Sequence, residues 1–122
     1  MSNAWKSLER RVCRALGAER AGPRGKHGAD DDGSAPFSVE TKRTTRYSLR
    51  RSWIEQARRQ GKTDGRPWLL VIGEHYDKRP ICVLDFWVLA EIAQLAGMIG
   101  AVNVEAELEE EGLDEHEGVQ LG

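Results

Sequence analysis

The feature that most constrains the fold is a short, uninterrupted apolar run at residues 67–73, Pro-Trp-Leu-Leu-Val-Ile-Gly. A run of this length without a polar position is typical of a β-strand that is buried on both faces. Such a strand needs other elements packed against each side of its sheet. The run therefore favours a layered fold with helices around a small sheet.

Helices are predicted on both sides of this run in the sequence. Apolar residues at three- and four-residue steps predict a first helix that begins near Trp5 and ends at Gly17. A second helix is expected from Ser48, which can cap it, to Gly61. A third helix is expected after Asp85.

Strands are predicted between these helices. Residues 36–42 alternate between apolar and polar side chains, and residues 81–84 form a short apolar run. The Gly-, Pro- and Asp-rich residues 21–36 predict a hairpin with short strands. The expected class is α/β, a small mixed β-sheet flanked by helices in the order α-β-β-β-α-β-β-α, within a single domain at residues 1–103.

Composition excludes several classes of protein. Hydrophobic residues make up 39% and charged residues 31%, and no apolar run approaches the ~18 residues of a membrane span. The first residues lack the apolar core of a signal peptide, so a cytoplasmic protein is expected. Two cysteines are too few for a disulfide scaffold or a cysteine-rich zinc site, and the three histidines lack ligand spacing.

Charge is distributed unevenly along the chain. All 18 Lys and Arg residues lie between Lys6 and Arg79 with 10 of the 20 acids, a net charge of +8, whereas the 10 other acids follow Pro80 without any base. The basic part suits a polyanion such as DNA, and the alternative is an ordinary solvated surface. Residues 104–122 are expected to form an acidic, mobile tail.

One strand face combines a carboxylate with a lysine. Glu40 and Lys42 lie two residues apart, so both side chains point to the same face of the predicted strand. The aspartates at residues 30–32 end the predicted hairpin strand, and neighbouring strands lie ~4.8 Å apart, so one aspartate can approach Glu40. Close carboxylates repel each other, and Mg²⁺ relieves the repulsion, with Mn²⁺ as a substitute.

This arrangement suits phosphodiester hydrolysis. The metal would polarise a phosphate and lower the pKa of a bound water, while Lys42 would orient that water or stabilise the developing charge. The alternative is an exposed strand face with a cross-strand ion pair, because about 0.8 acid-x-lysine matches are expected by chance in this composition.

The ordered set of motifs resembles the PD-(D/E)XK nuclease superfamily, in particular its small phage-type and Holliday-junction-resolvase-like endonucleases. The set comprises Glu9 on the first helix, the Gly-rich segment with Asp30, residues 37–42 (Phe-Ser-Val-Glu-Thr-Lys) and residues 53–57 (Trp-Ile-Glu-Gln-Ala). The resemblance covers about residues 4–95. It implies a restriction-endonuclease-like core, a Mg²⁺ cofactor and the hydrolysis of DNA, with a structure-selective role in phage or mobile-element recombination.

The resemblance also implies roles for single residues. Glu40 and an upstream aspartate would bind the metal, Lys42 would be catalytic, and Glu9 and Gln56 would assist at the site. Ala29 replaces the proline that often precedes the aspartate. The Asp-x-x-Gly turn favours Asp30 as the ligand, strand geometry could equally select Asp31, and Asp32 is the third choice.

Ordinary roles compete with these functional ones. Glu9 could be an exposed helix residue paired with an arginine, and Gln56 could be a plain polar position. The tryptophans lie on apolar stripes, so core packing is favoured over base stacking, for example at Trp53. Basic residues near the predicted site are expected to contact DNA: Arg24, Lys26, His27, Arg43, Arg46, Arg50 and Arg51.

Two further expectations concern partners. The apolar third helix, continued by Met98 and Ile99, leaves hydrophobic surface for a homodimer. The alternatives to a nuclease are a non-catalytic nucleic-acid-binding module and an interaction protein whose acidic tail mimics DNA.

Overall fold

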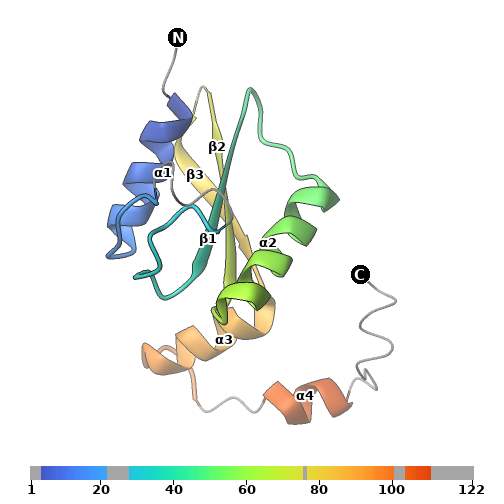
Figure 1. Cartoon of the computed structure of the whole chain (residues 1–122). Coiled ribbons are helices and arrows are strands. Elements are labelled where there is room, and N and C mark those ends of the chain that lie inside the picture. The colour runs from blue at the N-terminus through green and yellow to red at the C-terminus, as the bar shows by residue number, and fades with distance from the viewer. Residues whose placement is uncertain (1–3, 22–27, 76, 101–103, 111–122) are drawn as a thin grey trace. The chain divides into compact units, whose positions relative to one another are not determined.

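A three-stranded mixed sheet organises the first part of the molecule. The computed structural model describes residues 4–21, 28–75, 77–100 and 104–110. The strands β1 (Ser38–Thr44), β2 (Trp68–Glu74) and β3 (Asp77–Leu84) lie in the order β1-β2-β3 (Figure 1). β1 runs parallel to β2, and β3 runs antiparallel to β2. The apolar run forms the central strand, with Leu70 and Ile72 fully buried, so both the buried strand and the α/β class are confirmed.

The chain divides into two compact units, Met1–Asp85 and Phe86–Gly122. The first unit contains the sheet together with α1 (Ala4–Ala15) and α2 (Arg51–Asp64). The single domain at residues 1–103 that the sequence analysis expects stays a prediction.

Each face of the sheet packs on a different helix. Val39 of β1 belongs to an apolar cluster with Cys13 of α1, whereas Leu70 and Ile72 of β2 pack on Ala57 of α2. Successive side chains of a strand point to opposite faces, so the even-numbered positions of β1 face α2. Figure 1 shows α1 and α2 on opposite sides of the sheet. Glu40 and Lys42 therefore lie on the α2 side.

Helix α2 is the crossover between the two parallel strands. It begins at Arg51, with Arg50 as an N-cap that makes no side-chain capping bond, so the predicted start at Ser48 is wrong. It continues past Gly61 to Asp64 and ends at Gly65, whose φ of 71° is left-handed. Gly61 lies close to the start of β2. A Cβ at this position would lie 2.8 Å from the Arg66 carbonyl oxygen and 3.0 Å from the Trp68 Cβ. A glycine is needed at this close contact.

The hairpin expected before β1 does not form in the described residues, so the order α-β-β-β-α-β-β-α is wrong at this point. The described order is α-β-α-β-β-α-α, and the segment contributes only an isolated bridge between Arg20 and Asp31. Aspartate side chains bond to nearby backbone instead: Asp31 Oδ2 accepts from Gly33 N at 2.9 Å, and Asp32 Oδ1 accepts from Ser34 N at 3.0 Å. Such local bonds compete with strand pairing.

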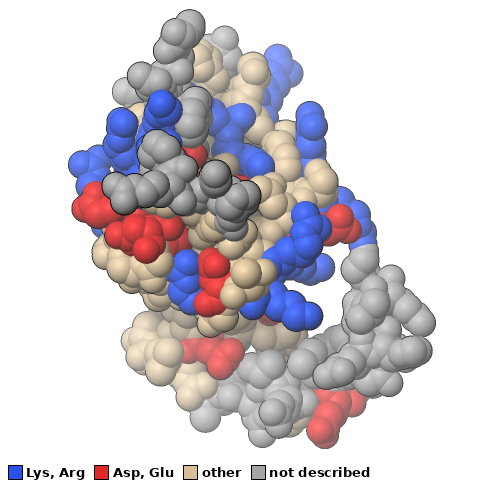
Figure 2. All heavy atoms as spheres, viewed as in Figure 1, with Lys and Arg blue, Asp and Glu red and all other residues tan. Residues whose placement is uncertain are grey.

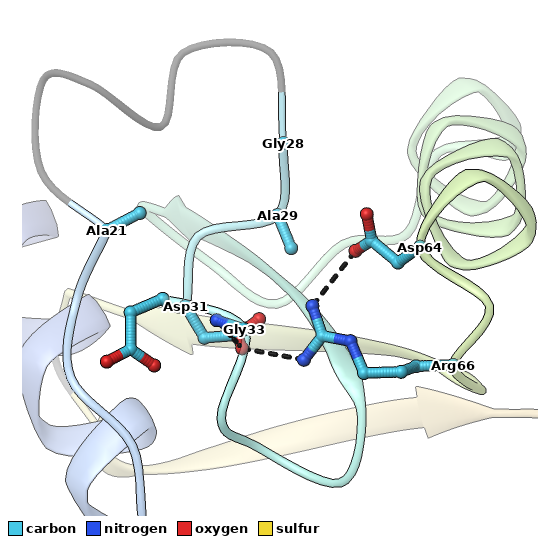
Figure 3. Close-up of a pocket in the computed structure, with 8 residues that line it drawn as sticks. Ala21, Gly28, Ala29, Asp31, Gly33, Asp64 and Arg66 are labelled. Atoms are coloured by element: carbon cyan, nitrogen blue, oxygen red, sulfur yellow. Dashed lines mark hydrogen bonds and ion pairs between the residues drawn. The ribbon is translucent and has the colours of Figure 1, made fainter.

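Arg66 fastens the segment before β1 to the end of α2. Its Nη1 donates to Asp31 Oδ2 at 2.7 Å and to the carbonyls of Ala35 and Phe37 at 3.0 and 2.8 Å. Its Nη2 donates to Asp64 Oδ2 at 3.0 Å. Figure 3 shows these groups beside a pocket of about 330 Å³. Neither Glu40 nor Lys42 lines that pocket.

The second unit contains α3 (Phe86–Leu95) and α4 (Val104–Glu110). The predicted third helix is confirmed, and it ends in backbone bonds from Gly97 N to Gln94 O and from Met98 N to Ala93 O, which complete the helix terminus. None of the residues of α3 is buried. The homodimer expected from this apolar helix stays a prediction. α4 is a helix within the predicted acidic tail, and residues 111–122 of that tail lie outside the described residues.

We expect Arg66→Ala to lower the free energy of unfolding by about 3 kcal/mol, because it leaves the fully buried carboxylate of Asp31 without its countercharge. Urea denaturation followed by tryptophan fluorescence measures this change. The matched control is Asp32→Ala, which removes an exposed carboxylate from the same turn and should leave the midpoint nearly unchanged. Equal midpoints for the two variants would contradict the anchoring role of Arg66.

Candidate active site

Glu40 lies at the centre of the candidate site. It is only 8% exposed in the middle of β1, facing α2. Gln56 of α2 donates from Nε2 to Glu40 Oε2 at 3.0 Å, and Lys42 Nζ lies 3.8 Å from the same oxygen. The α2 crossover and the strand thus bring together Glu40, Lys42 and Gln56, three residues that the sequence analysis assigns to one site.

Asp30 approaches from the edge of β1 that is not paired with β2. Its backbone N donates to Val39 O at 2.7 Å, which places the residue alongside the strand. Its Oδ2 accepts from Thr41 N at 2.7 Å and from Thr41 Oγ1 at 2.9 Å. The carboxylate is therefore held at the edge of β1 by Thr41, the residue between Glu40 and Lys42, and its charge raises the pKa of Glu40 after burial does. The sequence analysis expects the aspartate to approach from a neighbouring strand, and in the structure it approaches from a loop.

The other two aspartates do not join the site. The side chain of Asp31 is fully buried and points into the Arg66 cluster (Figure 3). Its Oδ2 accepts from Gly33 N and Arg66, and its Oδ1 accepts from Val39 N at 3.2 Å. Asp32 is exposed and caps Ser34. Of the predicted ligands Asp30, Asp31 and Glu40, Asp31 is corrected to a structural residue because both of its oxygens are occupied within the fold.

Glu9 of α1 is buried and not exposed, and it forms an ion pair with an arginine, as the alternative in the sequence analysis expects. Arg20 donates from Nε to Glu9 Oε1 at 2.6 Å. Burial raises the pKa of Glu9, the hydrogen bond from Arg20 opposes the rise, and the charge of Asp30 adds to it, so the two carboxylates lie within electrostatic reach of each other. Arg20 lies beyond the end of α1, so no helical spacing relates it to Glu9. The pair forms only when the chain folds back along α1, and the sequence does not indicate Arg20 as the partner.

Negative charge is concentrated around Glu40. Its pKa is raised to about 7, first by burial and then by the charge of Asp30, while the Lys42 ammonium opposes the rise. Burial likewise raises the pKa of Asp30, and hydrogen bonds from Thr41 oppose this effect. Burial raises the pKa of Glu9 as well. Carboxyl groups whose pKa values are raised by burial and by one another are a frequent mark of functional sites.

The donor set limits the metal that the site could hold. Among the described residues, no group of three or more His, Cys, Asp or Glu side chains is placed to hold an ion. Asp30 and Glu40 each keep one carboxylate oxygen that accepts no hydrogen bond from the described residues. Two carboxylates completed by waters and substrate oxygens suit Mg²⁺, which rarely uses a cage made entirely of protein ligands.

The predicted DNA-binding residues fall into three groups. Arg24, Lys26 and His27 lie outside the described residues. Arg43 follows Lys42 on the opposite face of β1, and Arg46 is exposed beyond the strand. Arg51 is exposed and pairs with Glu55 at 3.3 Å, whereas the guanidinium of Arg50 lies 5.4 Å from the ring centroid of Trp53.

The raised pKa of Glu40 predicts a pH dependence of stability in the absence of divalent ions. Between the ordinary value of 4.5 and about 7, the folded protein keeps a proton that the unfolded chain has released. The free energy of unfolding should therefore fall as the pH rises through this window, by about 3 kcal/mol. Urea denaturation from pH 5 to pH 8 measures the slope.

Glu40→Gln should flatten this slope and make the variant more stable than the wild type at pH 8. Glu55→Gln, which changes an exposed carboxylate on α2, should keep the wild-type slope. A slope in Glu40→Gln equal to that of the wild type would contradict the burial argument.

Comparison with known proteins leaves the family open. No family model matches the chain, and neither the curated proteins nor the solved structures include a match. Of the helices in the described part of the chain, none has the length and apolarity needed to cross a bilayer. The resemblance to PD-(D/E)XK nucleases therefore stays a prediction from the motif residues.

Proposed function

We propose that this protein is a magnesium-dependent endodeoxyribonuclease that hydrolyses DNA phosphodiester bonds. The observation that supports the proposal best is the grouping of Asp30, Glu40 and Lys42 around one segment of β1, with the pKa of Glu40 raised to about 7. Two crowded carboxylates destabilise a metal-free protein, and a divalent cation would remove that cost. An ammonium group beside such a pair is suited to act on a phosphate.

Each residue has a role in this proposal. Asp30 and Glu40 would hold Mg²⁺, which when bound would polarise the phosphate and acidify a water. Lys42 would donate hydrogen bonds to the attacking water or to the phosphate oxygen on which charge develops. Gln56 keeps one oxygen of Glu40 turned towards α2, which leaves the other oxygen for the ion. Thr41 fixes the carboxylate of Asp30 through two hydrogen bonds.

Basic side chains are exposed on the helices of the first unit. Lys and Arg atoms gather over α1 and α2 in Figure 2. The exposed residues of α2 include four cations, Arg51, Arg58, Arg59 and Lys62. Such a surface binds phosphate backbones without reading sequence, and its affinity falls steeply with salt. Arg50, one of the predicted DNA-binding residues, lies over the same Trp53 ring as Lys42. The proposed DNA-binding surface therefore starts beside the candidate site.

A non-catalytic DNA-binding module is the second candidate. The close approach of Lys42 to Glu40, together with the lack of a three-ligand cluster in the described residues, favours it. It requires the same basic surface but no metal chemistry. The two candidates differ in whether DNA is cut when Mg²⁺ is added.

We expect the purified protein to nick supercoiled plasmid when Mg²⁺ or Mn²⁺ is present and not with chelator. Glu40→Ala and Asp30→Asn should abolish cleavage because each removes a metal ligand, and Lys42→Ala should lower the rate by roughly 10²- to 10³-fold. All three variants should retain the circular dichroism spectrum and DNA binding. Gel analysis of the plasmid forms measures the rates.

Asp32→Asn is the matched control, since Asp32 shares the turn with Asp30 but is exposed and points away from the site. It should cut like the wild type. Full activity of Glu40→Ala and Lys42→Ala would remove the assignment of this site as the nuclease centre, and wild-type binding without cutting would support the DNA-binding module. A faster rate on a four-way junction than on linear duplex would support the resolvase-like role.

A further inference from the structure

Lys42 has a neighbour that the mechanism above does not use. Its Nζ lies 5.9 Å from the ring centroid of Trp53, and 3.8 Å from Glu40 Oε2 on its other flank. The lysine side chain is 25% exposed, so burial alone does not fix it. A lysine has four rotatable bonds in its side chain and tends to sample many conformers when only one contact restrains it.

Trp53 and Gln56 lie on one face of α2, and their side chains contact the face of β1 that carries Lys42 and Glu40. The two helix residues lie three positions apart and are neighbours on the helix surface. Glu40 and Lys42 lie two positions apart on the strand and share a face. Trp53 meets Lys42 and Gln56 meets Glu40, so a single helix face determines where both strand side chains lie.

The indole ring is itself held by packing. Trp53 is half-buried and packs against the apolar cluster of Ala57, Leu70 and Ile72, which joins α2 to the central strand. An ammonium near the face of an aromatic ring is attracted by the negative charge of that face, most strongly when the ring is tryptophan. The packed ring therefore offers the Lys42 ammonium a fixed face of partial negative charge.

We propose that Trp53 is a positioning residue that holds the ammonium of Lys42 beside Glu40 for the cleavage reaction. This inference depends on the proposed nuclease function for its kinetic consequence. The placement of Lys42 by Trp53 is independent of that function. Trp53 does not touch the substrate in this proposal, and its effect on the rate passes through Lys42.

The chain offers a matched control in Trp68. This residue packs against the same apolar cluster, and its ring lies 5.7 Å from the guanidinium of Arg58, so it also combines core packing with a cation. It has no contact with Lys42 in the described structure. Trp68→Leu therefore reproduces the loss of an indole from the core without removing the support of Lys42.

The first measurement uses metal-free protein and needs no activity. The side-chain methylene signals of Lys42, assigned by their loss in Lys42→Arg, should show a ring-current shift in the wild type. Trp53→Leu should move them to the positions of an unstacked lysine, and Trp53→Phe should retain a reduced shift. Trp68→Leu should leave the signals unchanged. Unchanged Lys42 signals in folded Trp53→Leu would overturn the proposal.

The second measurement is the kinetics of plasmid cleavage with Mg²⁺. Trp53→Leu should lower kcat by roughly 2- to 30-fold, the range that a cation–π contact supports. Trp53→Phe should recover most of the rate, and Trp68→Leu should cut like the wild type. A loss confined to KM would assign Trp53 to DNA binding through Arg50 and overturn the proposal, as would an equal loss of kcat in Trp68→Leu.

The two measurements distinguish failure of the nuclease assignment from failure of the positioning role of Trp53. If the wild type does not cut DNA and Trp53→Leu still releases the Lys42 signals, the positioning role holds and the nuclease assignment is wrong. If Trp53→Leu does not fold, Trp53→Phe and Trp68→Leu decide the question. A Lys42 ring-current shift that is the same in Trp53→Phe as in Trp68→Leu would then overturn it.

Discussion

The burial of two carboxylates beside one strand, with the charge of Asp30 acting on Glu40, is the constraint on which the rest of the site depends. Glu40 is buried between β1 and α2, and Asp30 is held against the outer edge of the same strand. Burial raises the pKa of both, and the charge of Asp30 raises the pKa of Glu40 further. Among the described residues, Lys42 forms an ion pair with Glu40 at 3.8 Å, and the charges of Lys42 and Arg20 oppose the rise in the pKa of Asp30 without cancelling it. The fold thus maintains a local excess of negative charge that suits a divalent cation.

The elements around the strand keep this arrangement in place. The α2 crossover supplies Gln56 to Glu40 and Trp53 to Lys42, and Gly61 lets the helix lie close to the start of β2. At the other end of α2, Arg66 ties the loop before β1 to the helix terminus through Asp31 and Asp64. This tie holds Asp31, the residue after Asp30. The two neighbouring aspartates therefore have separate places, Asp30 at the candidate site and Asp31 in the cluster that stabilises the fold.

Much of the fold follows from local pattern, whereas the site depends on contacts between distant residues. The buried strand and the shared face of Glu40 and Lys42 are predictable, because periodicity and alternation are local properties. The choice between Asp30 and Asp31 is not, because it depends on Arg66, which lies 35 residues further along the chain. The predicted hairpin does not form in the described residues, where the side chains of Asp31 and Asp32 accept hydrogen bonds from backbone nitrogens two residues further on. The stripe containing Trp53 predicts core packing, and the contact with Lys42 is an additional role that periodicity does not indicate.

The most direct test of this account is the titration of the Glu40 carboxyl carbon by NMR, with and without saturating Mg²⁺. The account predicts a pKa of about 7 without the ion and a clearly lower pKa with it, because the bound cation favours the carboxylate form. Asp30→Asn should lower the metal-free value and weaken the response to Mg²⁺. The same Glu40 pKa in the presence and absence of Mg²⁺ would contradict the claim that these carboxylates form a cation site.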